Sequence, residues 1–147
     1  MRRISRFLPR WWPGRGDPRR DRSAAGIRDR HDEAVRALAA ACRRADTAAL
    51  RAALDADAVA VCDSGAPAPT APHSIHGARD VARLVAVLLC GRPGADVTVE
   101  AVNGRAGLVL RRGGRAVAVV AVGTAGAAVS RLWIVLNPAK LGGWHRR

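Results

Sequence analysis

Three side chains in the middle of the chain could accept a proton from a substrate. Asp63, His73 and His76 supply the carboxylate and imidazole groups that most often act as general bases. All three lie in or beside a segment rich in Pro and Ala, residues 66–72. Catalysis favours side chains mounted on rigid elements, so this placement makes a non-catalytic role the first interpretation and an acid/base enzyme the second.

The same side chains could also bind a metal ion. His73 and His76, at an i, i+3 spacing, would share the ion with Asp63. Two imidazoles in a loop, with no third ligand fixed nearby, are more typical of surface histidines. We therefore predict no metal and no cofactor.

The first part of the chain is strongly basic. Residues 1–30 carry ten Arg and three Asp, and the whole chain has a net charge of +13. Three prolines within residues 9–18 discourage a continuous helix, so we predict a disordered basic arm over residues 1–27. Arginine binds phosphate and Trp11-Trp12 could stack on bases, so the arm predicts weak, nonspecific attraction to nucleic acid.

The sequence does not predict export or membrane insertion. Residues 2–8 resemble a twin-arginine motif, but the apolar stretch of roughly 7–15 residues that export requires does not follow. The runs 84–90 and 116–122 have seven apolar residues each, against the ~20 that span a bilayer. The three cysteines (Cys42, Cys62 and Cys90) lack CxxC spacing, which favours buried, reduced thiols in a cytoplasmic protein.

The length and composition predict one folded domain. The chain has 147 residues, 49% of them hydrophobic, but only four Trp, one Phe and no Tyr. The core must therefore consist mostly of Ala, Val and Leu. We place the domain at residues 28–142 and a basic tail at 143–147. Trp144 could dock back on the domain or contact a partner, and the sequence leaves both open.

Apolar spacing predicts three helices. The first begins near Asp29 and has one apolar stripe, the second is capped by Asp46-Thr47, and the third ends at Gly91. Residues at i, i+3, i+4 and i+7 define the stripes of the first and third helices: Val35, Leu38, Ala39 and Cys42, then Val81, Leu84, Val85 and Leu88.

Five strands are predicted around these helices. They cover residues 57–62, 97–102, 108–112, 115–122 and 129–136. Asn103-Gly104, Gly113-Gly114 and residues 123–126 supply the turns, and Arg111, Arg112 and Arg115 are predicted to form an exposed hairpin tip. The order α-α-β-α-β-β-β-β predicts an α+β fold, with helices packed on a curved, mainly antiparallel sheet.

Several stretches together resemble the SnoaL-like, or nuclear-transport-factor-two-like, cone fold. The resemblance is greatest to the C-terminal extension of one group of actinobacterial extracytoplasmic-function sigma factors, and it covers about residues 30–142. The segments that carry it are VRAL (35–38) with the chain up to Leu54, DAV (57–59) with DSGA (63–66), IHGARDVAR (75–83), VNGRAGLVL (102–110) and VLNPAKL (135–141).

The resemblance implies a contact surface. In the family, the loop after the first strand and the terminal motif contact the sigma regions. In this sequence the corresponding residues are Asp63, Ser64 and Gly65, with Asn137, Pro138, Lys140 and Leu141. The terminal motif of the family usually reads NPDKL, and Ala139 replaces its Asp in this chain; the DGGG-like loop of the family is reduced here to DSGA (63–66). These departures predict that the contact is relaxed or lost. A short basic arm replaces the promoter-recognising regions, so the chain is not expected to act as a sigma factor alone.

The resemblance also implies a pocket inside the cone. Trp133 and Arg131 share one face of the last strand with Val135, and together with Glu100 they are predicted to line a ligand pocket. Related cyclases and isomerases use such a pocket for proton abstraction, but the absence of Tyr excludes a Tyr oxyanion donor.

The leading hypothesis is a regulatory or ligand-sensing module that contacts sigma regions or an RNA-polymerase-associated protein; the alternative is a small cyclase- or isomerase-type enzyme. Homodimers are common on this fold, and the last strands offer a face for one.

Overall fold

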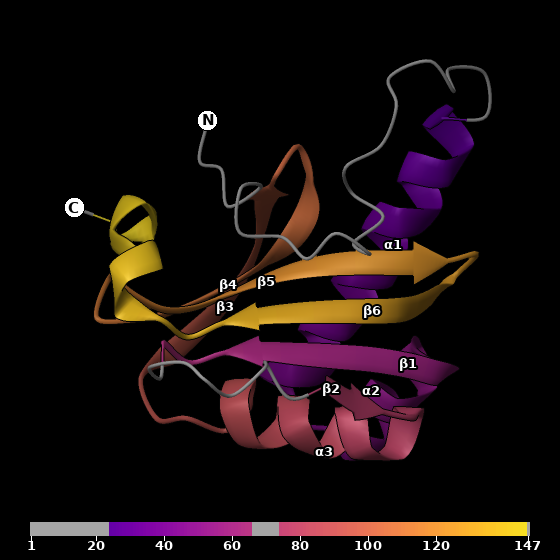
Figure 1. Cartoon of the computed structure of the whole chain (residues 1–147), viewed down its shortest axis with the longest axis horizontal. Helices are drawn as coiled ribbons and strands as arrows, with labels where there is room; N and C mark the ends of the chain where they lie inside the picture. Colours follow the sequence, from indigo (N-terminus) through magenta and orange to yellow (C-terminus); the bar gives the residue numbers. More distant parts are fainter. Residues whose placement is uncertain (1–23, 66–73, 147) are drawn as a thin grey trace.

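The computed structural model of the chain describes residues 24–65 and 74–146. Within this part, three helices pack on one face of a curved six-stranded sheet (Figure 1). The predicted α+β class is confirmed. No described helix is long and apolar enough to cross a membrane. Residues 1–23 of the predicted arm, and His73, lie outside the described residues.

The helices follow the predicted apolar stripes. Helix α1 (Ala24–Arg43) begins earlier than predicted, because Ala is the strongest helix former and Ala24-Ala25 extend the first turn. Helix α2 (Thr47–Ala53) begins at the predicted cap, where Asp46 Oδ1 accepts a hydrogen bond of 3.1 Å from the Ala49 amide. Helix α3 (Ala78–Leu89) buries Val81, Ala82, Val85 and Leu89.

The six strands form one mixed sheet. In chain order they are β1 (Leu54–Asp63), β2 (Ser74–His76), β3 (Ala95–Val102), β4 (Arg105–Arg112), β5 (Arg115–Ala125) and β6 (Ala128–Val135). Their order in space is β2-β1-β6-β5-β4-β3. All neighbours are antiparallel except β1 and β6, which run parallel. Two short 3-10 turns follow the last strand: η3 (Pro138–Lys140) and η4 (Gly142–Trp144).

Two features of the sheet differ from the prediction. The edge strand β2 was not predicted, since three residues are too few to show a periodicity; it pairs with β1 through Ala60 and Ile75. Strand β5 has 11 residues and extends past its predicted end at residue 122. Gly123 does not end β5, because it stays in the ladder opposite Arg131 and the irregularity that follows is accommodated as a bulge.

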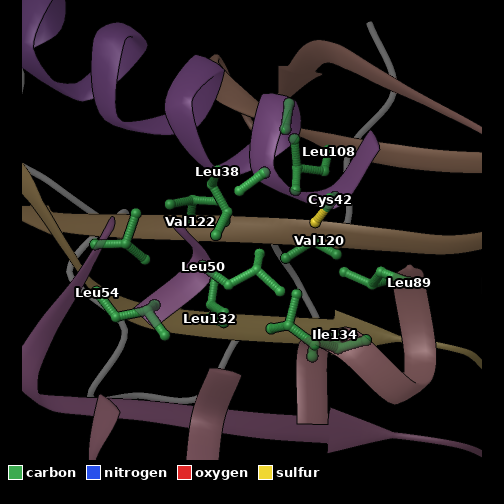
Figure 2. Close-up of a cluster of buried hydrophobic side chains, with 14 of the residues drawn as sticks. Leu38, Cys42, Leu50, Leu54, Leu89, Leu108, Val120, Val122, Leu132 and Ile134 are labelled. Atoms are coloured by element: carbon green, nitrogen blue, oxygen red, sulfur yellow. The ribbon is translucent and has the colours of Figure 1, made fainter. Parts of the chain in front are cut away.

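The two faces of the sheet bury separate apolar clusters. The larger lies between helices and sheet, consists of Ala, Val, Leu, Ile and Cys side chains, and includes Leu38, Leu50 and Leu132 (Figure 2). The smaller lies on the opposite face, where Leu141 and Trp144 of the C-terminal segment pack with Trp133. We call this second side of the sheet the outer face. The alternation predicted for β6 is confirmed, because Leu132 and Ile134 belong to the first cluster and Trp133 and Val135 to the second.

Candidate functional site

The ends of β1 and β6 bring together the two segments that the sequence singled out. Because these strands are parallel neighbours, both leave the sheet at the same edge, with Asp63 opposite Val135. The pairing continues by one residue, since the Leu136 amide donates to the Asp63 carbonyl at 2.7 Å. We call this junction the β1–η3 corner; its residues are Asp63, Ser64, Gly65, Asn137, Pro138, Ala139, Lys140 and Leu141.

An ion pair holds the corner together. The Lys140 ammonium contacts the Asp63 carboxylate, and the two side chains are 19% and 20% exposed. The same ammonium lies 5.9 Å from the centre of the Trp133 ring, within range of a cation–π interaction. Lys140 is therefore fixed by a charge on β1 and by an aromatic ring on β6.

Gly65 and Asn137 meet at the centre of the corner. Asn137 caps η3, its Oδ1 accepting a hydrogen bond of 3.1 Å from the Ala139 amide. Gly65 has φ +77°, and a Cβ at this position would lie only 2.8 Å from the Asn137 side chain. Glycine is thus required both by the backbone conformation and by the close approach.

The corner presents a small surface on a rigid base. Leu141 is buried in the outer-face cluster, whereas Ser64, Gly65, Pro138 and Ala139 are exposed. The charged groups of the corner neutralise each other, so the arrangement can hold a surface in a fixed shape for a partner. The Asp63 carboxylate is engaged by Lys140 in this arrangement.

The structure places the three predicted pocket residues away from the helices. The Trp133 side chain is 3% exposed within the outer-face cluster, and Arg131 follows the same side of β6. Glu100 lies on β3 and receives two hydrogen bonds from Arg111, from Nη1 and from Nη2 at 3.0 Å. These hydrogen bonds are the main reason that the pKa of Glu100 falls to about 2. A pocket between helices and sheet is therefore not lined by Trp133 or Glu100.

The prediction of an exposed hairpin tip is correct for Arg112 and Arg115 but wrong for Arg111. The Arg111 side chain is only 4% exposed. Besides Glu100, it donates to Thr98 Oγ1 at 3.2 Å and to the Trp144 carbonyl at 2.9 Å. A buried guanidinium needs such partners, and it ties the C-terminal segment to β4. Trp144 thus docks back on the domain.

The candidate bases do not assemble into a catalytic group within the described residues. Asp63 Oδ1 accepts from the Gly65 amide at 3.1 Å, and its other oxygen contacts Lys140. His76 is exposed, and its Nε2 lies 3.0 Å from Ser74 Oγ. Over residues 24–65 and 74–146, no group of three or more His, Cys, Asp or Glu side chains is arranged to hold a metal ion.

A buried histidine on the helix side was missed by the sequence analysis. His31 of α1 has Nε2 at 2.9 Å from the Ala106 carbonyl and Nδ1 at 3.2 Å from Thr124 Oγ1. A carbonyl only accepts, so Nε2 carries a proton and donates it to Ala106, while Nδ1 shares a hydrogen bond with the Thr124 hydroxyl. Its position, four residues before Val35 on the apolar stripe, was the available signal. It joins α1 to β4 and β5.

The cysteines are free, as predicted, and Cys42 and Cys90 are buried while Cys62 is half-buried. A hydrogen bond with Cys90, together with burial, raises the pKa of Cys42. Burial also raises the pKa of Cys62. Both thiols therefore stay protonated and are weak nucleophiles.

Comparison with known proteins supports the fold and its relation to a sigma factor. No protein-family model and no curated protein matches the sequence. Among solved structures, the chain is similar to the extracytoplasmic-function sigma factor SigJ of Mycobacterium tuberculosis, with 25% identity and a TM-score of 0.54. The match covers 82% of this chain but only 46% of SigJ, so the chain spans less than half of that protein.

Two further structures resemble the chain at lower identity. An NTF2-like protein of unknown function from Mesorhizobium loti has 17% identity and a TM-score of 0.54, over 75% of this chain and 93% of that one. A putative ketosteroid isomerase from Kribbella flavida has 18% identity and a TM-score of 0.51, over 73% and 77%. These likenesses concern the fold alone. Three helices on a curved, mixed six-stranded sheet, and these matches, show that the chain has the NTF2-like, or SnoaL-like, cone fold that also occurs in the sigma factor SigJ.

Proposed function

We propose that the chain is a non-catalytic, cytoplasmic regulatory or ligand-sensing module that acts through protein contact in transcription regulation. Its contact surface is the β1–η3 corner, and its partners are sigma regions or an RNA-polymerase-associated protein. The proposal is supported by the likeness to SigJ at 25% identity. It also rests on the implied role of the two segments that form the corner.

One observation carries the proposal. The segments Asp63–Gly65 and Asn137–Leu141 are far apart in the sequence, yet the structure joins them through the Lys140–Asp63 ion pair and the Gly65–Asn137 contact. Residues that contact one partner together have to lie on one surface, and the exposed residues of the two segments, Ser64, Gly65, Pro138 and Ala139, belong to the same corner. The substitution of Ala139 for the acidic residue of the family motif leaves Lys140 paired with Asp63.

The enzyme alternative has less support from the side chains. A cyclase- or isomerase-type reaction would need Asp63 or His76 as the base, with His73 outside the described residues. The Asp63 carboxylate is engaged by Lys140 and Gly65, and His76 is exposed at the edge strand. The likeness to a putative ketosteroid isomerase concerns the fold, which hosts more than one function.

The dimer face offered by the last strands is partly covered by the chain itself. Leu141 and Trp144 pack with Trp133 and Val135 on the outer face of β6. Docking of this segment favours contact with a different protein, at the corner, over pairing of two copies across the sheet.

The experiment compares two variants in each of which one exposed alanine is replaced by arginine. Ala139→Arg places a guanidinium on the exposed surface of the corner, whereas Ala127→Arg places it in the exposed turn at the opposite end of β6. Binding of the full chain to region 2 and to region 4 of SigJ is measured by calorimetry. We expect A139R to weaken binding by about tenfold or more, a loss of ~1.4 kcal/mol, and A127R to leave it unchanged. Equal effects of both variants would contradict the proposed surface.

A further inference from the structure

The turn between β4 and β5 places two exposed cations directly opposite each other. Arg112 and Arg115 are paired in the antiparallel register, and both are exposed. Gly113 and Gly114 connect them with φ +58° and +77°, the positive values that a two-residue turn of this type requires. Like charges at directly opposed positions destabilise a sheet, so an anion bound between them would be stabilising.

The C-terminal segment adds a third cation at the same turn. The Arg146 amide donates to the Gly114 carbonyl at 2.8 Å, and the Ala116 amide donates to His145 Nδ1 at 2.9 Å. Trp144 anchors this segment, since its side chain is 3% exposed. The Arg146 backbone is thus fixed beside the turn, and its side chain remains 54% exposed.

Nearby carboxylates offset only part of this charge. Glu100 is bound by the buried Arg111, and Arg146 Nη2 lies 3.7 Å from the same carboxylate. Asp96 lies opposite Arg111 in the register of β3 and β4. Four arginines thus gather near two carboxylates. Arg112 and Arg115 flank a turn whose two central residues have no side chains, and the Arg146 backbone is held beside that turn.

We propose that this turn is a binding surface for the phosphodiester backbone of nucleic acid. We call it the arginine turn, formed by Arg112, Gly113, Gly114, Arg115 and Arg146. Guanidinium groups bind phosphate oxygens in a bidentate manner. A bulky anion could approach the backbone closely at Gly113, because a Cβ there would have no heavy atom within 4 Å. A bound phosphate would relieve the repulsion between Arg112 and Arg115. The net charge of +13 would steer a polyanion toward the chain. This inference is independent of the sigma-region contact, which lies at the β1–η3 corner.

The test removes two charges from the arginine turn and compares this with two charges removed elsewhere. The variant is Arg112→Gln with Arg115→Gln, and the matched control is Arg79→Gln with Arg83→Gln, two exposed arginines on α3. Binding of each full chain to a short labelled DNA duplex is measured by anisotropy over a series of salt concentrations. The basic residues 1–30 are present in every protein, so their contribution cancels in the comparison.

The expected result is a change in the salt dependence that only the turn variant shows. Each phosphate group that an arginine no longer neutralises should make the slope of log K against log salt shallower by about 0.9, so R112Q/R115Q should change the slope by up to about 1.8. The control R79Q/R83Q should keep the slope. Equal changes in both variants, or no change in either, would overturn the proposal.

Melting temperatures show whether the variant has a folding defect, and a competition experiment shows whether the turn binds a different ligand. Removing opposed like charges should leave the melting temperature of R112Q/R115Q unchanged or raise it. The duplex should raise the melting temperature of the wild-type chain more than that of R112Q/R115Q, because only ligands that bind the folded state stabilise it. If inorganic phosphate displaces the duplex from the wild-type chain at equal phosphate concentration, the turn binds isolated phosphate groups and the assignment to a nucleic-acid backbone is wrong.

Discussion

Lys140 of η3 is ion-paired with Asp63, the last residue of β1, across 77 residues of sequence. The pair closes the corner where β1 and β6 leave the sheet, and the Trp133 ring lies beneath the ammonium group. Partial burial raises the value of such a pair above that of a fully exposed one, because water screens it less. The position of η3 relative to β1 therefore depends on these two side chains.

The effects of substituting Lys140 and Asp63 on the free energy of unfolding should be coupled through the ion pair. We expect Lys140→Met and Asp63→Asn each to lower the free energy of unfolding, and the double variant to lose about 1 kcal/mol less than the sum of the single losses. Urea denaturation of the four proteins measures this coupling. Strictly additive losses would show that the two side chains act independently.

Gly65 should tolerate substitution less than a glycine with the same backbone requirement and open surroundings. Gly91 has φ +66° and no heavy atom within 4 Å of a Cβ, whereas the Cβ of residue 65 would meet Asn137. We expect Gly91→Ala to cost about 1 kcal/mol and Gly65→Ala about 1 kcal/mol more, measured as free energies of unfolding. Equal losses would mean that Asn137 yields without cost.

The free energy of unfolding should depend on pH through Glu100. Hydrogen bonds from Arg111 lower the pKa of Glu100 from 4.5 to about 2. The folded state therefore binds the proton less tightly than the unfolded chain. The stabilisation is complete above pH 4.5 and is lost as the pH falls toward about 2. The contribution is about 3 kcal/mol at most.

Glu100→Gln should flatten the acid limb of a plot of unfolding free energy against pH, and the exposed control Glu33→Gln should keep it. Persistence of the full limb in E100Q would assign the acid dependence to other carboxylates. E100Q should also be less stable than the wild type at neutral pH, because Arg111 then keeps a buried charge without its anion.

The buried His31 should contribute through its two hydrogen bonds. His31→Leu leaves the Ala106 carbonyl and the Thr124 hydroxyl without their partner, and Thr124→Val leaves Nδ1 without its partner. Each substitution should cost about 1–3 kcal/mol, and the double variant less than the sum. A double variant that loses the full sum would contradict a direct His31–Thr124 interaction.

Much of the fold follows from periodicity in the sequence. The stripe around Val35 and Leu38 predicts α1, and alternation along β6 separates Leu132 from Trp133. The short strand β2 could not be predicted, because its pairing with β1 depends on a contact between distant segments. The extension of β5 through Gly123 depends likewise on its ladder with β6.

The candidate site was predictable only in part. The resemblance pointed to both segments of the corner, but neither segment alone indicates that Lys140 reaches Asp63. Arg111 looked like a turn residue, because nothing in the local sequence shows that Trp144 folds back over it. His31 was missed, since a single polar residue at the start of an apolar stripe gives no sign of the strands it will meet.

The most direct test of the proposed function is binding of the full chain to region 2 and to region 4 of SigJ, measured by isothermal titration calorimetry. We expect saturable binding at about micromolar affinity or tighter, weakened when Ala139 of the corner is replaced by Arg and unaffected when Ala127 is replaced. A folded chain that binds neither region, or that binds with equal affinity after both substitutions, would contradict a regulatory contact through the β1–η3 corner.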